Sequence, residues 1–174
     1  STFTQLADKE IDGYTFETKT TAGSVANLRL ISDGYIDLAI VQADLLSDAY
    51  NATATFADKK YQKGYKAVAS LYTECCQIVV RKDSGITGID DLINKTVSVG
   101  ASESGTEKNA EQILKMSGIT DELINKVNMD YTEAAEKLKA GEIDAFFCTA
   151  GTRTEVIGQL SKECDIHLIS LDDK

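Results

Sequence analysis

Short apolar runs that suit β-strands alternate with amphipathic helical patterns along the whole chain. In residues 24–34, apolar residues three apart share one helical face, and Gly34 follows as a stop signal. In residues 36–44, apolar residues fill a short stretch that suits a buried strand. This alternation predicts βαβ units, which build mostly parallel sheets with helices on both faces. The strands expected in this way lie at 14–23, 36–44, 65–72, 75–84, 95–101, 126–131, 143–151 and 165–171, and the helices at 24–34, 45–50, 90–94, 106–117 with a continuation at 121–125, 132–140 and 154–162.

The same pattern predicts an α/β fold with two lobes. We expect two sheets that meet near residues 71–77, and the chain has no proline that would mark a stiff linker there. The first lobe is expected to take in residues 1–74 and the second lobe residues 75–150. Residues 151–174 would supply a helix and a strand that complete the second lobe or return toward the first.

Two segments repeat one order of features. Both "NLRLISDGYIDLAIVQAD" and "AAEKLKAGEIDAFFCTAG" run from a helix through a glycine and an Ile-Asp pair into an apolar strand. Such echoes arise wherever αβ units recur, so they are weak evidence of duplication. They do predict that each lobe presents a strand end, at Gln42 or Thr149, to a shared space.

The charge balance limits the partners of the chain. With 18 basic and 28 acidic side chains the net charge is −10, which argues against a nucleic-acid groove or an anionic membrane surface. No apolar run reaches the roughly 18 residues that a membrane span needs. A small anion remains compatible, because a local cluster of amide donors can hold it.

The loop at residues 101–106 is the strongest candidate for such a cluster. It joins an expected strand to an expected helix, where unpaired N–H groups and the positive end of the helix dipole favour an anion. Ser104 and Thr106 add hydroxyls, and Gly105 allows close approach. The alternative is that Ser104 or Thr106 simply caps the helix, and the local sequence alone favours that alternative. Ser24 and Thr132 are likewise expected to cap their helices.

Residues for metal binding or catalysis are sparse. The sequence contains no C-x-x-C pair. Its single histidine, His167, is expected at an exposed strand position. We therefore predict no zinc site and no cofactor. Cys148 and Cys164 could form a bridge, although buried free thiols are the favoured interpretation for all four cysteines. A serine triad could use only His167, and Glu74 is a candidate acid whose ordinary role as a solvated carboxylate is equally consistent. We therefore expect no enzymatic activity.

Four segments together resemble the TAXI family of solute-binding proteins: "TTAGSVANLRLISDGYIDLAIVQAD", "ASLYTECCQIVVRKDSGITGIDDL", "TVSVGASESGTEKNAEQIL" and "AAEKLKAGEIDAFFCTAG". The resemblance runs from about residue 14 to residue 170. It implies a periplasmic-binding-protein-like fold of type II that closes on a small organic anion, such as a dicarboxylate or glutamate. It also implies TRAP membrane subunits as partners and a periplasmic or extracellular location, with a membrane anchor in the full-length protein.

Carried over by position, the resemblance implies a ligand site shared between the lobes. The last loop departs from the family's Ala-Gly-His-Pro pattern, which leaves the ligand open; Arg153 would either meet a second carboxylate or be solvated. The implied ligand-facing residues are Gly23, Ser24, Asn27 and Gln42 in the first lobe, Tyr72 at the crossing, and Ser104, Gly105, Thr106, Gly151, Thr152 and Arg153 in the second lobe.

Family members usually begin with a strand and a Gly-rich loop, and these features are missing here. We also expect that the usual C-terminal segment that returns to the first lobe is missing, and that the first lobe is incomplete in this chain. The hypothesis is that the chain is a fragment, or that another chain supplies the missing edge. Two other functions stay open for the same fold: a cytoplasmic effector-sensing domain of a transcriptional regulator, and an enzyme that would need an acid–base pair in the crevice.

Overall fold

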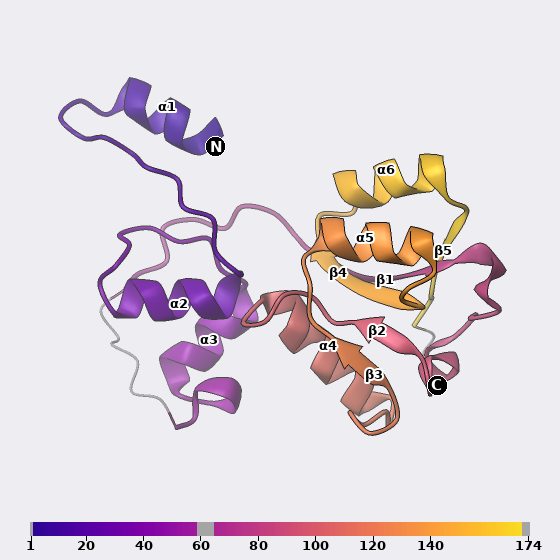
Figure 1. Ribbon diagram of the computed structural model, residues 1–174. Helices are drawn as coiled ribbons and strands as arrows, with labels where there is room; N and C mark the ends of the chain where they lie inside the picture. The colour runs from indigo at the N-terminus through magenta and orange to yellow at the C-terminus, as the bar shows by residue number, and fades with distance from the viewer. Residues whose placement is uncertain (1, 59–64, 172–174) are drawn as a thin grey trace.

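The computed structural model describes residues 2–58 and 65–171, which form two bodies joined by an extended segment that leads into β1 (Figure 1). The first body holds helices, and the second holds a five-stranded sheet with helices on both faces. The helices and short 3₁₀ turns of the first body are α1 (Thr2–Glu10), α2 (Ser24–Ser32), α3 (Ala43–Asn51) and the turn at Ala54–Phe56. Those of the second body are the turns at Lys82–Ser84 and Ile89–Leu92, α4 (Gly105–Met116), α5 (Tyr131–Ala140) and α6 (Glu155–Glu163).

The sheet is mixed and runs in the order β3-β2-β4-β1-β5. Strands β2, β3 and β4 are mutually parallel, whereas β1 is antiparallel to both of its neighbours, β4 and β5. The strand bounds are β1 Cys75–Arg81, β2 Thr96–Ser98, β3 Asn125–Val127, β4 Ala145–Ala150 and β5 Ile166–Leu168. The predicted strands of the second lobe are therefore confirmed.

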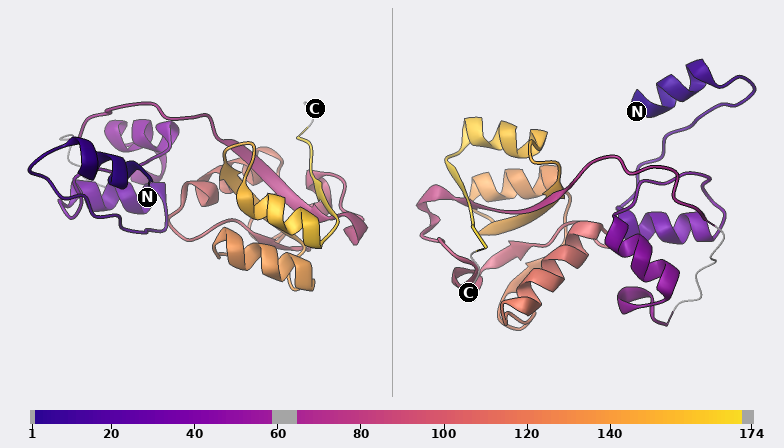
Figure 2. Two further views of the ribbon diagram at one scale, coloured as in Figure 1. Left: turned by 90° about the horizontal axis from the view of Figure 1, so that it is seen from above. Right: turned by 180° about the vertical axis from the view of Figure 1, so that it is seen from behind.

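Successive side chains along the strands point to opposite faces of the sheet and pack into two apolar layers. Ile78 and Phe147 pack with Leu114 of α4 on one face. Val79 and Phe146 pack with α5 and α6 on the other face. Figure 2 shows α4 on one side of the sheet and α5 and α6 on the other. Such period-two alternation is what a sheet covered on both faces requires.

Three predicted strands of the first lobe are wrong. Residues 14–23, 36–44 and 65–72 contain no strand, and the last residues of the second segment belong to α3. A strand exists only where a neighbour pairs its N–H and C=O groups, and these segments have no such neighbour among the described residues. The consequence is exposed apolar surface, with Val68 86% exposed and Ile40 65% exposed. The first body is held instead by α2 and α3, which pack around Leu28, Leu45 and Phe56.

Three local predictions also need correction. Residues 121–125 are not a helix, because Asn125 donates its backbone N–H to Lys95 O at 2.8 Å and so joins the sheet. Asp130, not Thr132, caps α5, since its carboxylate accepts from Glu133 N at 2.9 Å. Ser24 is the first residue of α2 rather than its cap, which is Gly23.

The second body extends from β1 to β5 among the described residues. β5 pairs with β1, and the α6 residue Leu160 packs in the same apolar layer as α5. We propose that the lobes divide near residue 74, as expected from the sequence, and that residues 151–171 belong with the second lobe. Within the described residues, no helix has the length and apolar character needed to cross a membrane.

Candidate functional site

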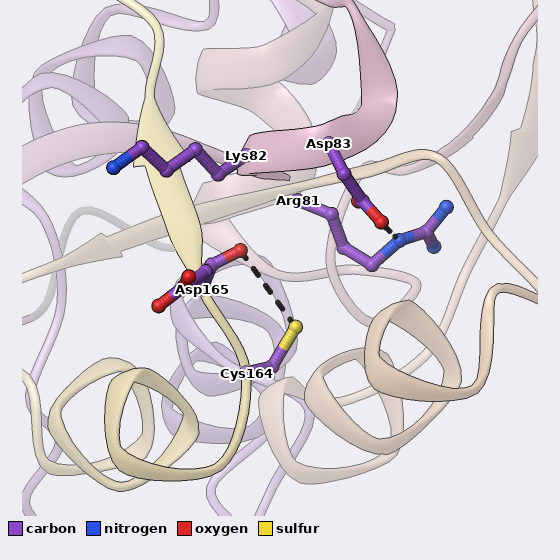
Figure 3. Close-up of a pocket in the computed structure, with 5 residues that line it drawn as sticks. All are labelled: Arg81, Lys82, Asp83, Cys164 and Asp165. Atoms are coloured by element: carbon purple, nitrogen blue, oxygen red, sulfur yellow. Dashed lines mark hydrogen bonds and ion pairs between the residues drawn. The ribbon is translucent and has the colours of Figure 1, made fainter.

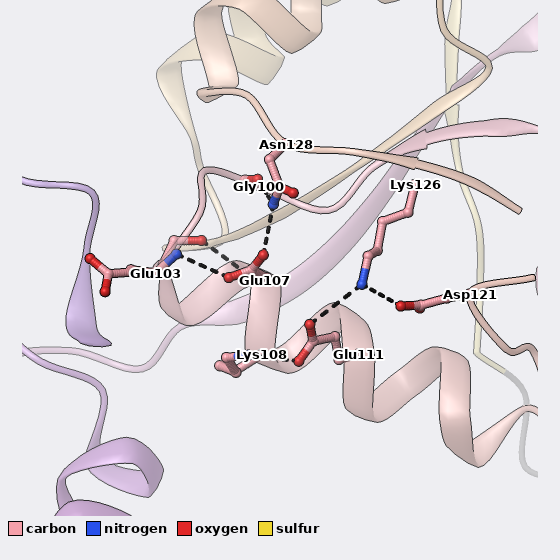
Figure 4. Close-up of polar contacts among 9 residues, drawn as sticks. Gly100, Glu103, Glu107, Lys108, Glu111, Asp121, Lys126 and Asn128 are labelled. Carbon is pink, nitrogen blue, oxygen red and sulfur yellow. Dashed lines mark hydrogen bonds and ion pairs between the residues drawn. The ribbon is translucent and has the colours of Figure 1, made fainter. Parts of the chain in front are cut away.

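The start of α4 is a capped helix end. Ser104 is the N-cap, and its hydroxyl accepts from Glu107 N at 3.0 Å. Glu107 reaches back, so that its carboxylate accepts from Glu103 N at 3.0 Å and from Asn128 Nδ2 at 2.8 Å (Figure 4). The capping role of Ser104 is thus confirmed. A side-chain carboxylate of the chain itself already offsets part of the positive potential of this helix end.

Loops of the first lobe lie directly against this helix start. At Gly23, where φ is +136°, an added Cβ would stand 3.0 Å from Ser104 Cα, so a larger residue would push the two loops apart. Ala26 N donates to Glu103 O at 3.3 Å. Arg29 forms an ion pair with Glu103 at 2.9 Å. The two loops that were expected to face a ligand therefore contact each other.

The side chain of Gln42 fills the space over Gly105. A Cβ added to Gly105 would stand 1.8 Å from Gln42 Oε1. Gln42 Nε2 donates to Glu74 Oε2 at 3.0 Å and to Asn109 Oδ1 at 3.1 Å. Gln42 Oε1 is buried and has no hydrogen-bond partner among the described residues. The carboxamide thus sits where the sequence predicted a bound anion.

Neighbouring residues fix the position of Gln42. Its backbone N–H donates to Ser24 Oγ at 3.0 Å, so Ser24 holds the loop rather than pointing free. Asn109 Nδ2 in turn donates to Asp44 Oδ2 at 3.3 Å. Asp44 and Asn109 were not expected here. Asn109 follows Gly105 by four residues, a spacing that places both on one side of α4 and could have identified it.

Thr106 faces the sheet instead of the space between the lobes. It is 3% exposed, and its hydroxyl is hydrogen-bonded to the hydroxyl of Tyr131. Tyr131 donates to Thr149 O at 3.0 Å, and Thr149 N donates to Thr106 Oγ1 at 3.4 Å. Burial raises the pKa of Tyr131, which therefore stays neutral at physiological pH. These bonds tie α4 and α5 to the end of β4.

Thr149 leaves one polar atom without a strong partner. The residue is 9% exposed, and its Oγ1 is buried without a hydrogen-bond partner that meets ordinary geometry. Its polar neighbour is the weakly hydrogen-bonding thiol of Cys76, which faces it across the β1–β4 pair. A second buried acceptor is thus poorly satisfied close to Thr106.

The other predicted site residues do not join this cluster. Asn27 is engaged within its own lobe, since it accepts from Thr21 Oγ1 at 2.6 Å and donates to Ile40 O at 2.8 Å. Tyr72 is 62% exposed. Within residues 2–58 and 65–171, no hydrogen bond or ion pair links it to the α4 start, and the same holds for Gly151, Thr152 and Arg153.

Two surface hollows lie away from the α4 start. One, of about 360 Å³, is lined by residues from the ends of β1 and α6: Arg81, Lys82, Asp83, Cys164 and Asp165 (Figure 3). Arg81 is already engaged there, by Asp83 at 3.3 Å and by Leu138 O at 2.9 Å. The other, of about 420 Å³, lies along α3 beside Tyr65. Neither hollow contains a residue of the expected site.

The thiols are free, as the sequence favoured. All four cysteines are unpaired, and Cys148 is buried while the others are half-buried. Burial raises the pKa of Cys148 to about 11 and also raises the pKa of Cys76. Thiols with raised pKa values are poor nucleophiles, because the thiolate is the reactive form. In the part of the chain that the structure describes, no group of three or more His, Cys, Asp or Glu residues could hold a metal ion.

Comparison with known proteins adds a family and a fold. The NMT1-like family matches residues 1–174. The alkanesulfonate-binding protein SsuA from Xanthomonas axonopodis pv. citri, bound to MOPS, is 17% identical over 95% of this chain, with a TM-score of 0.63. The periplasmic aliphatic sulphonate-binding protein SsuA from Escherichia coli is 15% identical over 97% of this chain, with a TM-score of 0.59.

These similarities confirm the predicted fold class, a periplasmic-binding-protein-like α/β fold. The chain spans about half the length of these structures, 53% of the first and 51% of the second.

Proposed function

Because this chain belongs to the NMT1-like family, we propose that it is the ligand-binding part of a solute receptor, one that holds a small organic anion between two lobes. The anion class we propose is a dicarboxylate or an acidic amino acid such as glutamate. The receptor would be extracytoplasmic, would carry out no chemistry on its ligand, and would deliver it to the membrane subunits of a TRAP-type transporter. The four sequence segments that resemble the TAXI family support this finer assignment.

The observation that carries the proposal is the convergence of both lobes on the start of α4. Gly23 and Gln42 come from the first lobe and contact Ser104 and Gly105 from the second. Gly105 opens a helix whose first N–H groups point away from the helix body, an arrangement that favours a carboxylate. The start of α4 also lies near the carboxyl end of β4, through Thr106 and Thr149. In parallel α/β sheets, ligands bind beside the carboxyl ends of strands.

The roles of the individual residues follow from their contacts. Thr106 would offer its backbone N–H, since its hydroxyl is engaged by Tyr131. Ser24 would position the Gln42 loop. Asn27, Tyr72 and the loop of Gly151, Thr152 and Arg153 are proposed to approach the ligand from the rim, in a form of the receptor with the ligand bound.

Calorimetric titration of the full-length protein tests the proposal. The panel is glutamate, glutamine, 2-oxoglutarate, succinate and, because the similar solved proteins are sulfonate-binding proteins, an alkanesulfonate. We expect a carboxylate to bind and Gly105→Ala to weaken it, because a methyl group would fill the space at the helix start. Gly158→Ala is the matched control, since that glycine faces open space on α6. Absence of binding across the panel would contradict the proposed function.

A further inference from the structure

We propose that the carboxamide of Gln42 occupies the ligand site when no ligand is bound, and that the ligand displaces it. A carboxylate of the ligand then takes the place of Oε1, and an N–H donor takes the place of Nε2. This inference rests on the proposed function. It narrows the ligand to a molecule that carries a carboxylate together with an N–H donor, as an α-amino acid does. A dicarboxylate without such a donor would fit less well.

The orientation of the carboxamide defines two subsites. Its Nε2 faces two acceptor oxygens, Glu74 Oε2 and Asn109 Oδ1, at 3.0 and 3.1 Å. Its Oε1 faces Gly105 at the start of α4. The reverse orientation would bring Oε1 against the carboxylate of Glu74, which can only accept, so the observed orientation is the one that the chemistry permits. The acceptor subsite, at Gly105, thus receives a hydrogen-bond acceptor, and the donor subsite, at Glu74 and Asn109, receives a hydrogen-bond donor.

The amide oxygen of Gln42 is a poor occupant of the acceptor subsite. Gln42 Oε1 is buried and has no hydrogen-bond partner among the described residues. A buried acceptor without a partner is costly, because it has lost its hydrogen bonds to water. A carboxylate would interact more strongly with the helix start, since it carries the charge that the dipole favours. The contact with Gln42 is therefore one that a suitable ligand can replace.

The donor subsite sets the second requirement. When Gln42 leaves, the carboxylate of Glu74 and the carbonyl of Asn109 lose the donor that they share. Asp44 lies next to Asn109 and adds a further negative charge. An ammonium or amide group would satisfy these oxygens, whereas a second carboxylate would be repelled. Binding then depends on how often Gln42 has already left the site, because a site that is only partly available binds with reduced apparent affinity.

The binding test compares Gln42→Ala with Gln159→Ala in the full-length protein. Gln159 is a solvent-facing glutamine of α6 bonded to Glu155, so its substitution matches the chemistry away from the site. We expect Gln42→Ala to bind glutamine or glutamate about three- to tenfold more tightly than wild type, and succinate to remain the weaker ligand. Gln159→Ala should bind as wild type does. Weaker or unchanged binding by Gln42→Ala, while wild type still binds, would overturn the inference and leave the proposed function standing.

A ligand-free measurement tests the contact itself. In ¹H–¹⁵N NMR spectra, Gln42→Ala should shift the backbone amide of Gly105 and Gln159→Ala should not. An unmoved Gly105 signal would overturn the occupancy of the helix start by Gln42. Absence of binding by wild type and by both variants would overturn the displacement step together with the proposed function, and the Gly105 signal would still decide whether Gln42 occupies the site.

Discussion

Gln42 Oε1 lies 1.8 Å from the point where a Cβ of Gly105 would stand, so the two residues cannot keep their present contact if position 105 carries a side chain. This relationship joins the lobes, because Gln42 precedes α3 and Gly105 begins α4. The clashing group is the far end of a flexible side chain. We expect it to move while the helix stays in place.

Gly105→Ala should therefore evict the Gln42 carboxamide and break its bonds to Glu74 and Asn109. Alanine favours a helix over glycine by about 0.5–1 kcal/mol, which offsets part of the loss. We expect the free energy of unfolding of Gly105→Ala to fall about 1 kcal/mol below that of Gly158→Ala, which gains the same helix preference without a clash. Urea unfolding measures the difference. Equal stability of the two variants would show that Gln42 does not pack on Gly105.

Tyr131→Phe should loosen the attachment of α4 to β4. The tyrosine hydroxyl joins Thr106 Oγ1 to Thr149 O, and its removal leaves a buried hydroxyl and a buried carbonyl short of a partner. The expected loss is about 1–3 kcal/mol in the free energy of unfolding. Tyr14→Phe, at a residue that is 73% exposed, serves as the control and should change stability by less than about 0.5 kcal/mol. Similar stabilities for both variants would argue against the bridging role.

The echo between residues 36–44 and 143–151 shows what the sequence could and could not predict. Both segments carry the same apolar pattern, but residues 145–150 form β4 between two paired strands, whereas the earlier segment has no strand beside it within residues 2–58 and 65–171. Pattern alone reports that a segment suits a sheet; it does not report whether a partner is present. The strands of the second lobe were predictable because all their neighbours lie within residues 75–171.

The candidate site divides in the same way. Ser104 was predictable as a helix start, since a helix cap depends on only a few consecutive residues. The contacts of Gln42 were not, because Glu74 and Asn109 lie 32 and 67 residues away in the chain. Thr106 was expected to face a ligand, and only the three-dimensional position of Tyr131 shows that its hydroxyl is engaged.

Asp130→Ala should destabilise α5, whereas Thr132→Ala should not. The Asp130 carboxylate accepts from Glu133 N at 2.9 Å, and loss of such a cap costs about 0.5–2 kcal/mol. Thr132 lies inside the helix, where alanine is the better helix former. Thermal and urea unfolding of the two variants make a direct comparison. A larger loss for Thr132→Ala would restore the cap position that the sequence suggested.

Alkaline pH should destabilise the protein in part through Cys148. Burial raises the pKa of this thiol from its ordinary 9.0 to about 11, so the folded state holds the proton more tightly than the unfolded chain does. Its contribution to stability is therefore fully present below pH 9.0 and is lost as pH rises through about 11. Unfolding by urea at about pH 8 and about pH 10.5 measures the loss. We expect Cys148→Ala to lose less stability across this interval than Cys75→Ala, because the buried thiol is then absent. An equal loss in the two variants would mean that the Cys148 proton is not linked to folding, and that other groups cause the alkaline decline.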